Sequence, residues 1–410
     1  MSLGQVYVQS PKAADPREVG ISPATVSLPR LDDGRTLHGR YVVVRNGGMI
    51  NVRDDEHGVA LRRIPDAAPD GEGNFIFRPG RGGTRVDRSL LVTQRRLENY
   101  IETSHFAEVN TYFHIDRMAA YIHELLAELG AGPIPKVIAV VHAHNAAMQP
   151  NDTRDGVKRR GRWAPFQGAH YRLPSAKYDV CEHFPLSNDG EIHLGAGRRR
   201  LVHGALSRSI HKPYRHNAGH NAGIICHEYG HHLNRHTADF RDNAHRPADA
   251  QSNRKVAMDE GCCDYWAGVM LQSPYIWAWH RRNDARYVHP RSLTSFKTMA
   301  DFDRGANADP HSNGTIWAAA LWDFRAKVTG VKPDGGRVAD SIVLKAQILI
   351  GRVARGSRPE TCRERARFRT GLAALLAAEE SIGGGKWRTA IVAAFAARGI
   401  RPTRRWEACP

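Results

Sequence analysis

The stretch "HNAGIICHEYGHHLNRH", residues 220–236, contains five histidines and a single acid, Glu228. If this stretch folds as an α-helix, His227 and His231 lie one turn apart on the same face. Two neutral imidazoles in this arrangement can bind one Zn²⁺, since both reach it at about 2.0–2.1 Å. Glu228 follows the first of them, where it can take a proton from a metal-bound water. The stretch therefore predicts a helix that carries a hydrolytic zinc site.

The remaining histidines of this stretch are predicted not to bind the metal. His232 is rotated by about 100° from His231 on a helix, so it should not reach the same ion. His220 and His236 are also interpreted as nonligands. Because the chain has 22 histidines, the H-E-x-x-H pattern would arise by chance in roughly one chain in twenty of this composition. A histidine-rich surface helix is the alternative, and a third ligand is needed to decide.

Two segments could supply the third metal ligand. A third histidine at the end of H-E-x-x-H-x-x-G-x-x-H is disfavoured, because Asn234 and Thr237 occupy the glycine and histidine positions. The segment "VAMDEGCCDYWAG" supplies Glu260 and, four residues later, Asp264. On a helix both carboxylates share one face, so one can bind the metal while the other accepts the outer N–H of a ligating histidine. We therefore predict Glu260 as the third ligand, against the alternative of two surface acids.

A further histidine precedes a predicted helix in "ADPHSNGTIWAAALWDFRAKVTG", residues 308–330. Asn313 is the expected N-cap of that helix and His311 is expected in the loop before it. A histidine at this place could donate a hydrogen bond to a developing oxyanion. The spacing alone favours an ordinary exposed loop histidine.

The rest of the chain predicts an α+β protein. Residues 1 to about 85 have the β-branched runs and turn signals of strands, and the segment after Arg88 has long stretches of helical spacing that end at Gly130. From Gly223 onward nearly every periodic segment is helical, and the last two helices are separated by three glycines at 383–385. The predicted strands include "YVVVRNGGMINV" (41–52), "GNFIFRPG" (73–80), "KVIAVVHA" (136–143) and "EIHLGAG" (191–197).

Composition limits the classes of partner. Of the 410 residues 41% are hydrophobic and 25% charged, as in an ordinary globular protein. The net charge of +17 is spread along the chain without interleaved aromatics, which favours a solvated basic surface over a nucleic-acid interface. No apolar run reaches the roughly 18 residues of a membrane span. The six cysteines include no C-x-x-C pair, so a thiolate zinc site is disfavoured.

Taken together, these motifs resemble the fungalysin-type zinc metallopeptidases, within the thermolysin-like gluzincins. The resemblance rests on "HEYGHHLN", "DEGCCDYWAG", "PHSNGTIWAAALWDFR" and "ALLAAEESIGGGKWRTAIVAAFAARGI", which follow the family order within about residues 70–400. It implies a two-lobed α+β fold with the H-E-x-x-H helix at its centre. The expected parts are a β-rich N-terminal region (1–85), an N-terminal catalytic lobe (86–236) and a helical C-terminal lobe (237–410).

The resemblance also implies a zinc endopeptidase that binds one Zn²⁺ per chain and acts on protein or peptide substrates. No motif indicates a calcium site, and the sequence does not exclude one. By motif, the expected zinc ligands are His227, His231 and Glu260. Glu228 is expected to be the base that activates water, and Asp264 is expected to orient a zinc histidine. His311 is expected to stabilise the transition state.

The chain departs from the family pattern at three places. No tyrosine lies between His231 and Glu260, where the family has a second oxyanion donor. The Asn-Ala pair that usually holds the substrate backbone does not directly precede "EIHLGAG". The arginine that binds a substrate carbonyl is expected at Arg281 or Arg282.

Two other functions therefore stay open beside the peptidase. The first is an inactive, zinc-bearing pseudopeptidase or binding protein on the same fold, although such a protein has no need of Glu228 as a base. The second is a basic nucleic-acid-binding protein, which only the net charge favours. The resemblance implies secretion, but the first 20 residues lack the pattern of a signal peptide, so a secreted and a cytoplasmic location both stay open. No pattern specifies an oligomeric state.

Overall fold

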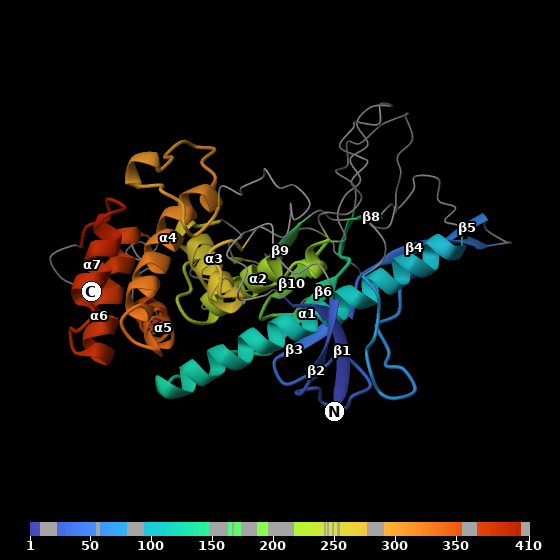
Figure 1. Ribbon diagram of the computed structural model, residues 1–410. Helices are drawn as coiled ribbons and strands as arrows, with labels where there is room; N and C mark the ends of the chain where they lie inside the picture. The colour runs from blue at the N-terminus through green and yellow to red at the C-terminus, as the bar shows by residue number, and fades with distance from the viewer. Residues whose placement is uncertain are drawn as a thin grey trace.

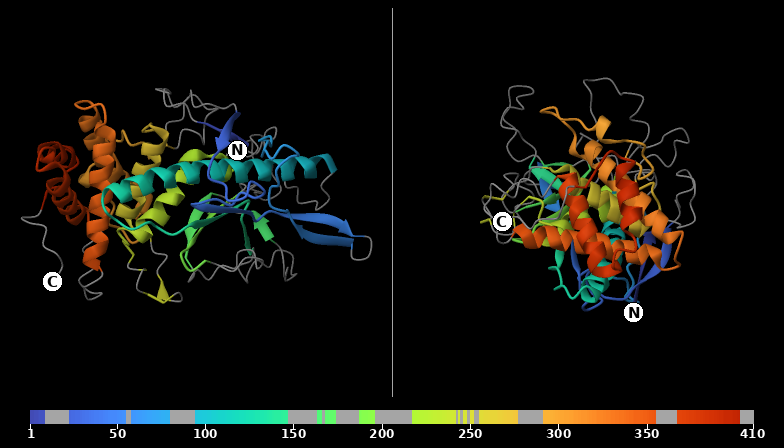
Figure 2. Two further views of the ribbon diagram at one scale, coloured as in Figure 1. Left: turned by 90° about the horizontal axis from the view of Figure 1, so that it is seen from below. Right: turned by 90° about the vertical axis from the view of Figure 1, so that its left-hand side faces the viewer.

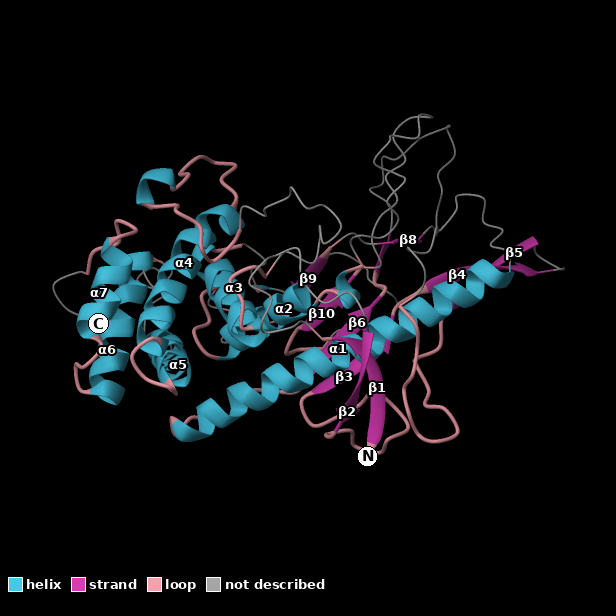
Figure 3. Ribbon diagram, viewed as in Figure 1, coloured by secondary structure: helices cyan, strands magenta, loops and turns pink. Residues whose placement is uncertain are grey.

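The protein is described by a computed structural model that has the predicted α+β class (Figure 1). The strands gather in one half of the molecule and helices α3 to α7 in the other, with α2 between them (Figure 3). The structure describes residues 1–8, 23–54, 58–79, 94–146, 163–165, 168–173, 187–195, 217–241, 243, 246–247, 250–251, 255–276, 291–354 and 367–402.

A four-stranded mixed sheet forms the centre of the strand-rich half. Its strand order is β3-β6-β10-β9, in which β3, β6 and β10 are parallel and β9 is antiparallel. All four residues of β10 are buried, as expected for an inner strand of a sheet covered on both faces. The strands of this sheet are β3 (Val42–Asn46), β6 (Val137–Val141), β9 (Ala169–Arg172) and β10 (Glu191–Leu194).

Three two-stranded antiparallel pairs complete the described strands. They are β1 (Ser2–Tyr7) with β2 (Pro23–Leu28), β4 (Met49–Asp54) with β5 (Gly58–Arg63), and β7 (His144–Ala146) with β8 (Trp163–Pro165). The strand predicted over 73–80 is wrong for the described residues 73–79, where only an isolated bridge joins Phe75 to Gly4. Phe75 is fully buried but Ile76 is 43% exposed. This segment therefore buries the Phe75 ring in the core without forming a continuous strand.

The long helix α1 (Gln94–Glu128) runs along the whole strand-rich half and reaches the helical half (Figures 1 and 2). Its predicted apolar face is fully buried at Met118, Ile122 and Leu125. After α1, Gly130 adopts a positive φ of 61°, a conformation that ends helices because glycine has no Cβ penalty there.

The helices that follow build the other half of the molecule. Their bounds are α2 (Ala222–His236), α3 (Ala257–Leu271), α4 (Pro310–Thr329), α5 (Gly335–Ala354), α6 (Phe368–Gly383) and α7 (Arg388–Ala396), with short 3₁₀ turns η3 (Ala218–His220) and η6 (Met299–Asp301). Asn221 is the N-cap of α2, and its side chain accepts a hydrogen bond from the backbone N–H of Ile224.

Helices α2, α3 and α4 meet backbone to backbone. A Cβ atom added to Gly230 of α2 would lie 2.8 Å from Cα of Cys263 in α3. A Cβ added to Gly314 of α4 would lie 2.9 Å from the backbone nitrogen of Gly261 in α3. Glycine is therefore required at both crossings, and these close contacts fix the spacing of the three helices that carry the site.

The division into regions 1–85, 86–236 and 237–410 stays a prediction. Strand β3 from the first region pairs in parallel with β6 from the second, so these two regions share one sheet. Among the helices that the structure describes, none combines the length and the apolar character that crossing a bilayer requires.

Candidate metal centre

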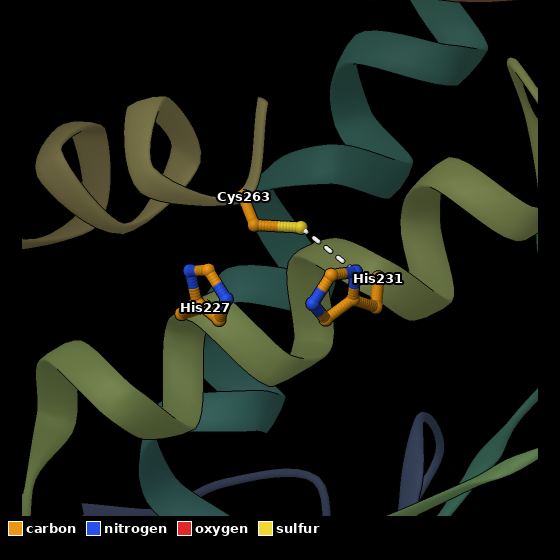
Figure 4. A group of neighbouring side chains, drawn as sticks. All are labelled: His227, His231 and Cys263. Carbon is orange, nitrogen blue, oxygen red and sulfur yellow. Dashed lines mark hydrogen bonds between the residues drawn. The ribbon is translucent and has the colours of Figure 1, made fainter. Parts of the chain in front are cut away.

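The two histidines of the H-E-x-x-H motif lie side by side on α2 (Figure 4). His227 is 2% exposed and His231 is 7% exposed. Their ring centroids are 5.0 Å apart and the rings are perpendicular. Because the residues are four apart, one helical turn brings both rings to the same face.

Glu260 on α3 faces both of these rings. Its Oε2 atom lies 3.2 Å from His227 Nε2 and 3.6 Å from His231 Nε2. Neither carboxylate oxygen of Glu260 has a hydrogen-bond partner of good geometry among the described residues. A fully buried carboxylate needs a cation or donors to compensate its charge. The Nε2 atoms of His227 and His231 and the carboxylate of Glu260 converge on one point. Two imidazole nitrogens and one carboxylate are a ligand set that suits Zn²⁺.

Cys263 competes with Glu260 for the third ligand position. Its Sγ and the two histidine rings offer ligand atoms that all lie within 4.8 Å of one another (Figure 4). However, Sγ lies 3.3 Å from His231 Nδ1, the ring nitrogen that does not face Glu260. Burial first, and then the carboxylates of Asp259 and Glu260, raise the pKa of the Cys263 thiol well above its usual range. Since zinc binds the thiolate, Glu260 fits the site better than Cys263.

The outer nitrogen of His227 contacts a carboxylate that is itself held by an arginine. His227 Nδ1 lies 2.8 Å from Asp264 Oδ1. Arg291 donates to both oxygens of Asp264, at 2.6 and 3.1 Å. Although burial opposes the charge, contacts with Asp264 and Glu260 raise the pKa of His227 in the metal-free protein to about 9. Such an outer carboxylate fixes the ring orientation and makes the other nitrogen a better metal ligand.

His231 has an equivalent pair of outer partners that the sequence patterns did not indicate. Its Nδ1 lies 3.2 Å from Asp259 Oδ2. Arg241 donates to this same oxygen through Nε at 3.0 Å and Nη2 at 2.6 Å. Burial opposes ionisation of Asp259, but Arg241 and His231 together lower the pKa of this carboxyl. A small, partly open pocket adjoins this group and is lined in part by His231, Arg241 and Asp259.

Glu228 lies next to His227 on α2 and is 6% exposed. Its Oε2 atom is buried and has no hydrogen-bond partner among the described residues. An unpartnered carboxylate oxygen beside two metal-type histidines is available to accept a proton. This is the arrangement that general base catalysis requires.

His311 lies in the first turn of α4, so the prediction of a loop position is wrong. Asp309 caps this helix by accepting from the backbone N–H of His311, and Pro310 occupies the first turn. Asn313, the predicted cap, is buried and bonds the backbone of Asp303 instead. Proline fits the first helical position because its missing N–H has no partner there anyway.

The ring of His311 reaches the edge of the candidate site. His311 Nε2 lies 3.3 Å from Glu260 Oε2 and 3.0 Å from Lys255 Nζ. Its Nδ1 lies 2.8 Å from Asp309 Oδ1. Burial, together with the charges of Arg291 and Lys255, lowers the pKa of His311 even though Glu260 opposes this shift. These effects favour the neutral form of the ring.

The histidines predicted as nonligands have other neighbours. The buried ring of His232 contacts Tyr171 Oη through Nδ1 at 3.0 Å and the carbonyl of Pro135 through Nε2 at 2.9 Å. His220 Nε2 lies 3.2 Å from the carbonyl of Thr103. His236 packs its ring against that of His232, with centroids 4.6 Å apart.

The predicted substrate-binding arginines, Arg281 and Arg282, lie outside the described residues. The arginines that the structure describes beside the site are Arg241 and Arg291, and no sequence pattern indicated either. An Asn-Ala pair, Asn145-Ala146, occurs in β7, well before the segment where it was sought.

A model of the fungalysin metallopeptidase family (M36) matches residues 136–402, which is more than half of the chain. The chain belongs to the fungalysin metallopeptidase family. The matched region extends from β6 through α7 and so includes α2, α3 and α4. No curated protein sequence matches the chain significantly.

Membership confirms the family that the sequence motifs suggested. Fungalysins are metallopeptidases and zinc enzymes, so this fungalysin-family chain is expected to act on proteins or peptides. The cluster around His227 and His231 lies in the matched region and is the group of described residues suited to hold the metal.

Proposed function

We propose that this fungalysin-family protein is a zinc-dependent endopeptidase with the thermolysin-like two-lobed fold. In this proposal His227, His231 and Glu260 hold one Zn²⁺. The observation that carries it is the convergence of Glu260 Oε2 on both Nε2 atoms, at 3.2 and 3.6 Å, beside the unpartnered Oε2 of Glu228. A group of three protein ligands leaves a fourth position for water or substrate, as in catalytic rather than structural zinc sites.

The proposed mechanism assigns a separate task to each group of the chain. When bound, Zn²⁺ supplies a Lewis acid that lowers the pKa of water and polarises the scissile carbonyl. Glu228 accepts the proton of the attacking water on its carboxylate and passes it to the leaving amine. Asp264 and Asp259 hold the rings of His227 and His231 in the orientation of ligands.

Other residues would bind substrate near this centre. His311 lies at the edge of the site, 3.3 Å from Glu260, and is proposed to help stabilise the transition state. Arg281 and Arg282 stay candidates for binding a substrate carbonyl. Arg291 is a third candidate, supported by its contact with Asp264.

Glu228→Gln tests the base. The amide nearly preserves size but cannot take a proton, so peptidase activity on unfolded casein should fall by at least about 10²–10⁴-fold. Zinc content should stay near one per chain, because no proposed ligand is changed. His231→Ala should lose most of the zinc, whereas His220→Gln, a change of a nonligand histidine in the same stretch, should keep both zinc and activity.

Three outcomes would contradict the proposal in different ways. A Glu228→Gln protein as active as the wild type would exclude Glu228 as the base. A wild-type protein that holds zinc and cleaves no peptide under any activating treatment would favour the inactive pseudopeptidase. Full zinc retention by His231→Ala would show that the ligands were chosen wrongly.

A further inference from the structure

A lysine ammonium lies at the edge of the candidate site. Lys255 precedes α3 by two residues, and its Nζ lies 3.0 Å from His311 Nε2. That nitrogen lies 3.3 Å from Glu260 Oε2. Lys255 is thus separated from the proposed ligand carboxylate by a single ring nitrogen, although its side chain is exposed at the surface.

The direction of the hydrogen bonds at His311 follows from the chemistry of the partners. An ammonium group has three donors and no acceptor, so Nε2 of His311 must accept from Lys255. The neutral ring then carries its hydrogen on Nδ1, where it donates to Asp309 Oδ1 at 2.8 Å. In this arrangement His311 presents a lone pair toward the site, and the hydrogens at this edge belong to Lys255.

The charge of Lys255 is also less compensated than that of its cationic neighbours. Arg291 is paired with Asp264 at 2.6 Å and Arg241 with Asp259 at 2.6 Å. Lys255 has no carboxylate within ion-pair distance in the part of the chain that the structure describes. Because a neutral ring is its contact there, the ammonium can exchange this partner for an anion without breaking an ion pair.

We propose that Lys255 is a further catalytic residue, whose ammonium donates a hydrogen bond to the oxyanion formed when the scissile carbonyl is attacked. The inference rests on the proposed peptidase function. No proton is transferred in this role: the ammonium keeps its hydrogens and stabilises negative charge that is absent from the substrate. A charge-assisted donor of this kind accelerates the reaction because it binds the transition state more strongly than the ground state.

The position of Lys255 in the chain agrees with this role. It lies two residues before α3, the helix that carries Glu260. The lysine places a positively charged donor beside His311. In this arrangement His311 holds the ammonium in place, and Lys255 supplies the donor to the oxygen.

Lys255→Met is the variant that tests the proposal, since methionine keeps an unbranched apolar side chain and removes the charge and all donors. The matched control is Lys297→Met, because Lys297 Nζ bonds Ser312 Oγ, next to His311, without a contact to the site. We expect kcat/KM on a peptide substrate to fall about 10²-fold in Lys255→Met, as on loss of an oxyanion donor. Zinc content should be unchanged, and the control should match the wild type.

Binding of a phosphoramidate peptide inhibitor gives a second readout. Its phosphoryl oxygen stands in for the oxyanion, so Lys255→Met should weaken inhibitor binding by about the same factor as kcat/KM, with little change in KM. Equal inhibitor affinity and equal kcat/KM in Lys255→Met and Lys297→Met would overturn the proposal while leaving the peptidase function intact. A wild type without zinc and without peptidase activity would overturn the proposed function and this inference with it.

The double variant separates direct contact from an effect through His311. If Lys255 binds the oxyanion itself, Lys255→Met should reduce kcat/KM further in a His311→Ala background. If Lys255 only orients the ring, the second change should have no effect once the ring is gone. That result would overturn the catalytic role.

Discussion

Replacing Asp259 by asparagine should weaken zinc binding although no proposed ligand is removed. The change leaves His231 in place but takes the negative charge from its Nδ1 partner, 3.2 Å away. The corresponding change at Asp264 acts on His227, whose contact is shorter at 2.8 Å. Losing an outer partner typically costs about 10–100-fold in metal affinity. The two distances place Asp259→Asn near the lower end of this range and Asp264→Asn near the upper end.

Each change also affects the stability of the fold, and this effect must be separated from metal binding. The Arg241 side chain is 12% exposed, so Asp259→Asn leaves a mostly buried guanidinium without its carboxylate. Breaking a buried ion pair from one side costs about 3–5 kcal/mol of stability. Adding Arg241→Met restores the charge balance, so the double variant should regain thermal stability but not zinc affinity.

Zinc affinity would be measured by competition with a chelator at pH 7, and stability by the Tm of the metal-free protein. Asp340→Asn is the matched control, because Asp340 pairs with Arg325 at 3.0 Å and has no contact with the site. It should lower Tm with unchanged zinc affinity. If Asp259→Asn behaves like this control, Asp259 supports only the fold and the reasoning about His231 is refuted.

Further outcomes are expected for His311, for two cysteines and for His227. His311→Ala should keep its zinc and lose about 10²-fold in kcat; an unchanged kcat would remove this ring from the reaction. Because burial raises the pKa of Cys226 and Cys262 to about 12, both thiols should resist alkylation at pH 8 until the protein unfolds, and rapid labelling of the native protein would contradict this. The raised pKa of His227, about 9, means that zinc must displace a proton at pH 7, so apparent zinc affinity should increase with pH up to about 9. The same proton stabilises the metal-free fold fully below the ordinary pKa of 6.5, and this contribution should be lost as the pH rises through about 9.

Helical spacing made much of the candidate site predictable. The four-residue spacing of His227 and His231, and of Glu260 and Asp264, fixes which side chains share a face wherever those segments are helical. The start of α4 was harder to predict, because Asp309 and Asn313 are both good caps. Pro310 decides between them, since proline is favoured in the first turn.

Partners that depend on how a loop folds back could not be read from local patterns. Arg241 precedes Asp259 by 18 residues, and no periodicity links the two positions. Arg291 reaches Asp264 from an irregular segment for the same reason. The role proposed for Lys255 depends on its contact with His311, which lies 56 residues later in the chain. Contacts of this kind depend on tertiary packing, which propensity and spacing do not encode.

The glycine crossings between α2, α3 and α4 have a consequence for how the metal would be lost. At Gly230 and Gly314 the helix backbones approach one another so closely that even one added Cβ would meet backbone at 2.8 and 2.9 Å. Damage to the apolar core therefore cannot gradually widen the distance between His231 and Glu260, as repacking of intervening side chains would. The helices either stay in contact and keep the ligands together or separate and release them. Zinc release during unfolding should accordingly be a single cooperative event that reports on the integrity of the three-helix unit.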